Sequence, residues 1–140
     1  MSGRTAPPSG TAPPATATTP SGRTLDLVAL ALKACERYDA EFPDERDRYG
    51  PAGMLWCRHD NQHVLNWAVL SLGGQVDLEE QLAWLGRILE SREFPLDRLA
   101  RSLEIVGETV NEADPEEREL VAQLEAGARF VRSRRSFLTE

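Results

Sequence analysis

The sequence predicts an all-α fold, an antiparallel bundle of about five helices that follows a disordered N-terminal tail. Two observations support this prediction. Apolar residues after position 24 recur at intervals of three and four, which is the spacing of a helix with one buried face. Glycine and proline fall between these periodic segments, where they are typical of helix ends and connections. Helices of this kind bury their apolar faces by packing on one another, so a bundle is expected.

Residues 1–22 are expected to form the tail, and residues 23–140 the bundle domain. The tail consists mostly of Pro, Gly, Ser, Thr and Ala, with one arginine and no acidic residue. Such a composition cannot bury enough apolar surface to offset the entropy lost on ordering. We therefore expect the tail to be dispensable for folding.

The first helix is expected over residues 25–42, with Thr24 as its N-cap. Its inward face would carry apolar residues spaced three and four apart, namely Val28, Ala31, Cys35, Tyr38 and Phe42. The polar segment "PDERDRYGP" then interrupts the helical pattern. The second helix is expected over residues 51–72, because the pair Gly73-Gly74 is typical of a helix end.

Three further helices are expected in the second half of the chain. The third begins with a capping box formed by Asp77 and Glu80. The fourth begins at residue 95 and repeats leucine or valine every three or four positions. The fifth follows Asp114-Pro115, a cap with proline at the first helical position, and Glu117 would complete its capping box.

Composition favours a soluble, cytoplasmic protein. No apolar run approaches the roughly 20 residues that span a bilayer, and the N-terminus lacks the apolar core of a signal peptide. With 16 basic and 23 acidic residues the net charge is -7, which disfavours binding to nucleic acid or to anionic membranes. Cys35 and Cys57 could face each other, but a cytoplasmic chain keeps its thiols reduced, so we expect core thiols.

The segment "MLWCRHDNQHVLNW" concentrates polar and aromatic residues on the predicted second helix. On a helical wheel the inward half holds Trp56, Trp67, Cys57, Asp60 and Asn61, whereas His59 points outward and His63 lies at the edge beside the tryptophans. An inward carboxylate is costly unless it is paired. We therefore expect Asp60 to bind His63 or an arginine of another helix, the candidates being Arg37, Arg101 and Arg129. The simplest interpretation is that Asp60 and Asn61 fix the helix register in the core.

A metal centre and an enzyme active site are both disfavoured. His59 and His63 have the i, i+4 spacing of helical zinc ligands and form the alternative metal pair, with Asp60 or Cys57 as a third ligand. Cys57, however, lies roughly 120° around the helix from His63, so one ion cannot reach both. The sequence offers neither a Gly-rich loop nor a nucleophile elbow. We expect no metal, no cofactor and no catalytic residues.

The segments "CRHDNQHVLNW" and "LEEQLAWLGRILESREFPLDRLARSLEIVGETV" resemble the helical N-terminal module of bacterial cobalamin-binding (corrinoid-dependent) sensor and regulator proteins. The matching positions are Cys57, Arg58, Asp60, Asn61, Trp84, Leu85, Pro95, Leu99 and Leu103. His59 stands where that family has glutamate, and the family's histidine falls one position after His63. The D-x-H-x-x-G motif that binds cobalamin in the family does not occur in this sequence. The resemblance implies a regulatory or partner-facing helical module without cobalamin.

Two functional hypotheses follow. The first is a non-enzymatic regulatory or protein-interaction module that binds a protein partner or forms a homodimer. Its interface would use apolar residues displaced from the predicted inward stripes, Val69 and Leu70 on the second helix and Phe130 and Phe137 near the C-terminus, with Leu70 and Phe137 as the main contacts. The alternative is a small-ligand or metal sensor that uses the face formed by Trp56, Asp60, His63 and Trp67 inside the bundle.

Overall fold

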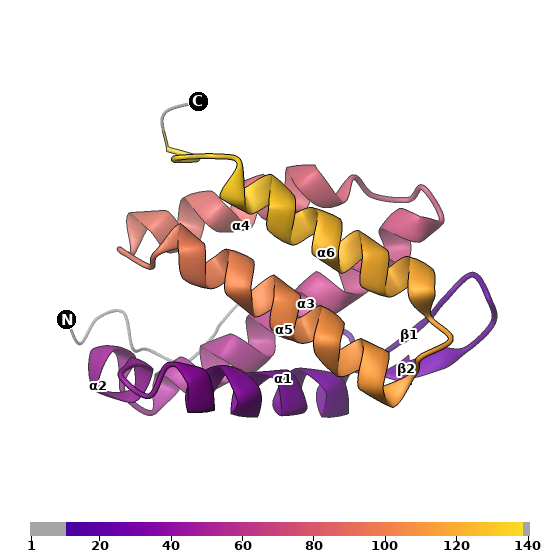
Figure 1. Ribbon diagram of the computed structural model, residues 1–140, viewed down its shortest axis with the longest axis horizontal. Helices are drawn as coiled ribbons and strands as arrows, with labels where there is room; N and C mark the ends of the chain where they lie inside the picture. The colour runs from indigo at the N-terminus through magenta and orange to yellow at the C-terminus, as the bar shows by residue number, and fades with distance from the viewer. Residues whose placement is uncertain (1–10, 139–140) are drawn as a thin grey trace.

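The computed structural model describes residues 11–138 and contains, within this range, six α-helices and one small antiparallel sheet (Figure 1). The prediction of an all-α bundle is confirmed, and each of the five predicted helices is present. A sixth, short helix lies in the segment that was expected to be only a connection. The elements are β1 (Thr16–Thr18), β2 (Thr24–Asp26), α1 (Leu27–Glu41), α2 (Glu45–Tyr49), α3 (Ala52–Leu72), α4 (Leu78–Ser91), α5 (Leu96–Ala113) and α6 (Arg118–Arg132).

The helices pack most extensively as two pairs, α5 with α6 and α1 with α3, and these pairs share one core. In Figure 1, α5 and α6 run side by side, α1 lies along one edge, and the β1–β2 hairpin lies at the end where α6 begins. α1 packs on α3 and on α5, and α4 packs on α6. Fully buried leucines from the hairpin's end and from each long helix fill the centre, among them Leu27, Leu65, Leu82, Leu103 and Leu124. The core therefore depends on every long helix.

The buried face of α1 differs from the predicted one. Val28 was expected to point inward, but it is 41% exposed, whereas Leu27 and Leu30 are buried. The helix starts at residue 27 with Asp26 as its cap, whose side chain accepts a hydrogen bond from the Ala29 amide at 3.0 Å. Thr24 belongs to β2 and is not the cap. The repeat of apolar residues thus starts one position before Val28, and Val28 faces solvent.

The N-terminal segment is more ordered than its composition predicts. Residues 11–22, expected to be a disordered tail, include β1 and the hairpin loop, while residues 1–10 lie outside the described range. The hydroxyl of Thr19, a residue that is 3% exposed, donates to the buried Glu117 carboxylate at 3.1 Å, and Ser21 donates to it at 2.9 Å. Glu117 makes no side-chain capping bond. Its buried carboxylate needs donors, and the hairpin supplies them.

The C-terminal segment packs back onto the bundle and corrects the predicted interface. Phe137, expected at an intermolecular contact, is 0% exposed and lies against Gly86 of α4 and the ring of Phe130. Its amide donates to Glu90 at 2.8 Å. Val69, expected on the outer face of its helix, is 3% exposed, and Leu70 is half-buried. α4 and α6 leave room for Phe137 within the chain, so this apolar residue is part of the core.

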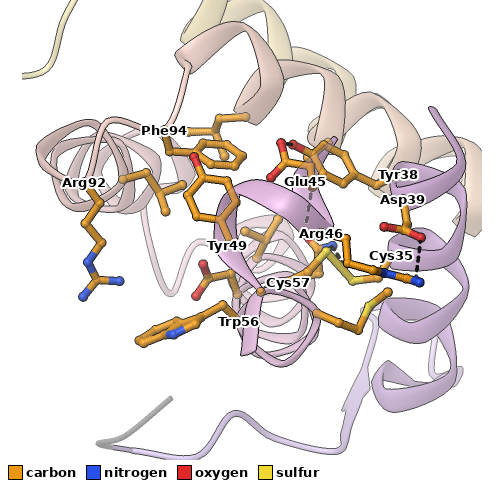
Figure 2. A pocket seen from close by; sticks show the side chains of 18 of the residues that line it. Cys35, Tyr38, Asp39, Glu45, Arg46, Tyr49, Trp56, Cys57, Arg92 and Phe94 are labelled. Carbon is orange, nitrogen blue, oxygen red and sulfur yellow. Dashed lines mark hydrogen bonds and ion pairs between the residues drawn. A yellow bond between two sulfur atoms is a disulfide. The ribbon is translucent and has the colours of Figure 1, made fainter. Parts of the chain in front are cut away.

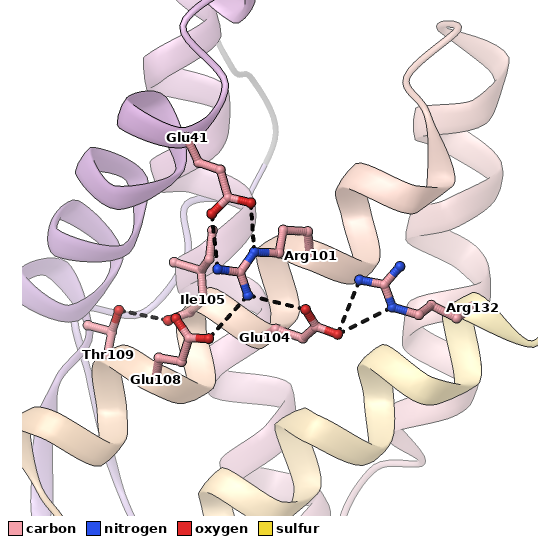
Figure 3. Close-up of polar contacts among 7 residues, drawn as sticks. All are labelled: Glu41, Arg101, Glu104, Ile105, Glu108, Thr109 and Arg132. Atoms are coloured by element: carbon pink, nitrogen blue, oxygen red, sulfur yellow. Dashed lines mark hydrogen bonds and ion pairs between the residues drawn. The ribbon is translucent and has the colours of Figure 1, made fainter.

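Ion pairs join three helices on one face of the bundle (Figure 3). The guanidinium of Arg101 binds both oxygens of Glu41 at 2.9 and 3.0 Å and also contacts Glu104 and Glu108. Arg132 of α6 binds Glu104 at 3.1 Å. A bidentate pair within a network has better geometry than an isolated surface pair, so these contacts fix α1 and α6 against α5. None of the helices described here is long and apolar enough to cross a membrane.

Candidate functional site

The polar cluster of α3 lies beside a partly open cavity of about 160 Å³. Side chains from α1 to α5 surround this cavity, and Figure 2 shows several of them facing it. Most of the lining is apolar or aromatic, as with Tyr38, Tyr49, Val64, Leu85 and Leu103. Polar and charged side chains, among them Asp60, Asn61 and Arg92, interrupt a lining surface that is otherwise apolar, as in many small-molecule sites.

The short helix α2 covers one side of the cavity and is held there by Glu45. The Tyr38 hydroxyl donates to the Glu45 carboxylate at 2.7 Å, and Arg98 of α5 donates to the same group at 2.6 Å. Burial of the phenol and the adjacent Glu45 carboxylate raise the pKa of Tyr38 far above its usual value, so its hydroxyl stays protonated. Arg98 also binds Asp44, just before α2, at 3.0 Å. α2 is thereby tied to both α1 and α5.

Cys35 and Cys57 form a disulfide at the edge of the cavity, which corrects the expectation of two core thiols. α1 and α3 pack so closely that the two Cα atoms are 6.1 Å apart, within the roughly 4.4–6.8 Å range that a disulfide requires. Sequence periodicity places both cysteines on helices but does not give the register between the helices. The pairing therefore depends on tertiary packing.

Asn61 is the buried polar group next to the disulfide. The residue is 5% exposed, so its predicted inward orientation is confirmed. Its amide nitrogen lies 3.4 Å from the Cys35 sulfur and 3.5 Å from the Cys57 sulfur, and its oxygen accepts from Ser102 at 3.5 Å. Sulfur is a weak acceptor, and 3.5 Å is long for a hydroxyl donor. The amide therefore retains hydrogen-bonding capacity beside the cavity.

Asp60 and His59 are arranged differently from the wheel-based prediction. The Asp60 side chain is 21% exposed and its carboxylate lies 3.2 Å from Nδ1 of His59, not beside His63. The predicted arginine partners Arg37 and Arg101 bind glutamates instead, and Arg129 is exposed. His59 was expected to point outward but is only 18% exposed. The neighbouring aromatic rings and α4 cover this side of α3, so it is not a solvent face.

An aromatic row runs along the side of α3 that faces α4 and continues onto α4. Successive ring centroids are 5.5, 4.8, 5.7 and 6.3 Å apart along the series Trp56, His59, His63, Trp67 and Trp84. The predicted position of His63 beside the tryptophans is confirmed by its stacking on Trp67. These residues line an open groove of about 870 Å³. The groove and the cavity share a wall made of Trp56, Asp60, Leu85 and Arg92.

The pKa values of the two histidines in this row are shifted in opposite directions. The hydrogen bond to Asp60 raises the pKa of His59, and burial lowers the pKa of His63. Because their rings are 4.8 Å apart, a proton on His59 further disfavours one on His63. In residues 11–138 no group of three His, Cys, Asp or Glu side chains could hold a metal ion.

Two parts of this site were missed by reasoning from the sequence. Arg92 stacks its guanidinium over the Trp56 ring at 4.7 Å, and Tyr38 contributes both to the cavity lining and to the attachment of α2. Arg92 belongs to the segment that resembles the sensor modules, but that resemblance does not place it against Trp56, and Tyr38 looked like an ordinary core residue. Comparisons with protein-family models, curated proteins and solved structures found no match, so the resemblance to cobalamin-sensor modules stays a prediction.

Proposed function

We propose that this protein is a non-enzymatic regulatory module that senses a small, mostly apolar ligand in the cavity beside Asn61. The observation that supports this proposal is a cavity of about 160 Å³ whose lining surface is mostly apolar. An engineered protein cavity of roughly 150 Å³ binds benzene, so the volume suits a ligand built on one aromatic ring. A regulatory role is also what the resemblance to sensor modules implies.

Asn61 and Ser102 supply the polar recognition in this proposal. Both line the cavity, and the 3.5 Å contact between them is long enough for a ligand group to compete with it. A hydroxyl or N–H on the ring would satisfy the amide oxygen, which otherwise has only this weak partner within the described contacts. A phenol or an indole therefore fits better than benzene itself.

The signal in this proposal passes through α2. Tyr49 of α2 and Tyr38 of α1 both line the cavity, and Glu45 ties α2 to α1 and α5. A ring between these side chains adds contacts to α2 and favours the position in which α2 covers the cavity. Ligand occupancy would thus be reported at the surface where α2 is exposed, without any chemical step.

Calorimetry and tryptophan fluorescence with phenol and indole test the proposal, because Trp56 forms part of the cavity wall. Val64 and Val69 are both buried valines of α3, but only Val64 lines the cavity. We expect Val64→Met to fill the space and weaken binding at least about tenfold, and Val69→Met to leave binding near the wild-type value. Absence of saturable binding, or equal losses in the two variants, would refute the proposal.

A protein-interaction role is the second candidate, and the exposure of Trp84 favours it. This side chain is 51% exposed and stands beside Trp67 at the groove. Tryptophan is enriched where proteins bind one another. Light scattering of the wild type and of Trp84→Glu tests the self-association form of this candidate. A dimer that Trp84→Glu dissociates supports it, and a monomer in both samples excludes it.

A further inference from the structure

We propose that the Cys35–Cys57 disulfide is a thiol-exchange site, which a small thiol reaches through the cavity and opens by attack on Cys57. Both cysteines line the cavity, and Figure 2 shows their bond at its edge. The proposal uses the cavity as a route and does not require the ligand proposed above. It therefore adds a covalent reaction to the binding function.

Burial makes the two sulfurs unequal. Cys35 is 0% exposed, whereas Cys57 is half-buried. In thiol–disulfide exchange the attacking thiolate must approach a sulfur directly, so access decides which sulfur is attacked. Cys57 is accordingly the attacked atom and Cys35 the leaving group. The mixed disulfide forms on Cys57.

Complete reduction of the disulfide consumes two equivalents of a small thiol. The thiolate of the first equivalent forms a bond to the Cys57 sulfur, the bond between the cysteines breaks, and its electron pair passes to the Cys35 sulfur, which takes up a proton. A second thiolate attacks the sulfur of the bound thiol. This releases the oxidised small disulfide and leaves Cys57 as a thiolate. The cystine is reduced by two electrons, and two small thiols are oxidised.

Asn61 is positioned to assist both steps. Its amide nitrogen lies within 3.5 Å of each sulfur and points a donor at the atom that gains negative charge. A hydrogen bond to a thiolate favours the charged form and lowers the pKa of the thiol. This assistance offsets the burial of Cys35, which by itself makes that thiolate a poor leaving group. Asn61 is a positioning residue in this reaction.

The cavity also selects the thiol by size. A space of about 160 Å³ accommodates 2-mercaptoethanol but not the tripeptide glutathione. The bond closes a segment with a sequence separation of 22 residues, and this segment contains all of α2. Opening the bond removes the covalent link between α1 and α3, the two helices that flank α2 in the chain. Exchange with small thiols would therefore loosen the cavity wall.

The test treats the purified, air-oxidised protein with 2-mercaptoethanol or glutathione at equal thiolate concentration, quenches with acid and maps the adducts by mass spectrometry. We expect the 2-mercaptoethanol adduct on Cys57. Relative to an exposed peptide disulfide, glutathione should react at least about tenfold more slowly than 2-mercaptoethanol. An adduct mainly on Cys35, equal relative rates, or two free thiols in the oxidised protein would overturn the proposal.

Two matched variants separate the roles of the sulfurs. Each single variant has one free thiol and no disulfide, so it is treated with the disulfide of 2-mercaptoethanol in place of the thiol. In Cys35→Ser, attack by the Cys57 thiolate should release one equivalent of 2-mercaptoethanol and leave a stable adduct on Cys57, whereas Cys57→Ser leaves a buried Cys35 that resists labelling. Circular dichroism checks that both fold, and adduct mapping on the wild type decides if either does not. Asn61→Leu should move the pH profile of adduct formation on Cys35→Ser to higher pH, and an unchanged profile would remove Asn61 from the mechanism. Binding of phenol is measured separately, so thiol exchange without ligand binding would refute only the proposed function.

Discussion

Gly86 and Phe137 offer a test in which one substitution should change the sign of its effect. Alanine is a better helix former than glycine by about 1 kcal/mol, so Gly86→Ala would ordinarily stabilise α4. Here an added Cβ would lie 2.5 Å from Cδ2 and 2.8 Å from Cε2 of the Phe137 ring. Carbon atoms in contact stand roughly 3.5–4.0 Å apart. The ring must therefore shift by about 1 Å or leave its place.

The magnitude follows from the burial of Phe137. The residue is 0% exposed, and truncating a phenylalanine in such a site costs about 3–5 kcal/mol. Overpacking that leaves the ring partly in place costs less, about 1–3 kcal/mol. Gly86→Ala in the wild type should thus destabilise by up to about 2 kcal/mol after the helix gain of about 1 kcal/mol is subtracted. In Phe137→Ala, where the obstacle is gone, the same change should stabilise by about 1 kcal/mol.

Urea unfolding of the wild type, the two single variants and the double variant measures this coupling. Leu138→Ala serves as the control, because Leu138 is 54% exposed and its truncation should change stability by less than about 0.5 kcal/mol. If Gly86→Ala has the same effect with and without the Phe137 ring, then the ring does not occupy the surface of α4.

Three further predictions concern the hairpin, the histidines and the disulfide. Glu117→Ala should cost about 1–3 kcal/mol in urea unfolding, because the buried Thr19 hydroxyl loses its acceptor; a loss below about 0.5 kcal/mol would argue against hairpin docking. In NMR titrations Asp60→Asn should lower the pKa of His59, and an unchanged pKa would disprove their bond. Because the folded pKa of His59 is raised, its contribution to stability is complete below about pH 6.5 and is lost as pH rises through the folded pKa. For His63, whose folded pKa is lowered, stability is lost as pH falls below about 6.5. Reducing the disulfide should cost about 3 kcal/mol for a separation of 22 residues, and an unchanged unfolding midpoint would show that the loop is already restrained.

Local sequence patterns predicted the long helices and several of their ends. The Asp77 side chain accepts from the amides of Glu79 and Glu80 as the capping pattern predicts, and α3 ends at Leu72 with Gly73 as its C-cap. These features depend on residues within a turn or two of each other. Local hydrogen bonds and the 3.6-residue period fix them whatever the rest of the chain does.

Contacts between distant segments placed the site, the N-terminal hairpin and the Phe137 ring. Whether Cys35 meets Cys57, whether Phe137 is buried and which residue binds Glu117 all depend on contacts across 20 or more residues. A single helical wheel cannot tell a solvent face from one that another helix covers, which is why His59 was misplaced. Likewise, the composition of residues 11–22 gives no sign of Glu117, the buried carboxylate that binds two of their side chains. Such features follow from how whole helices fit together, because burial and pairing stabilise only those surfaces that come into contact.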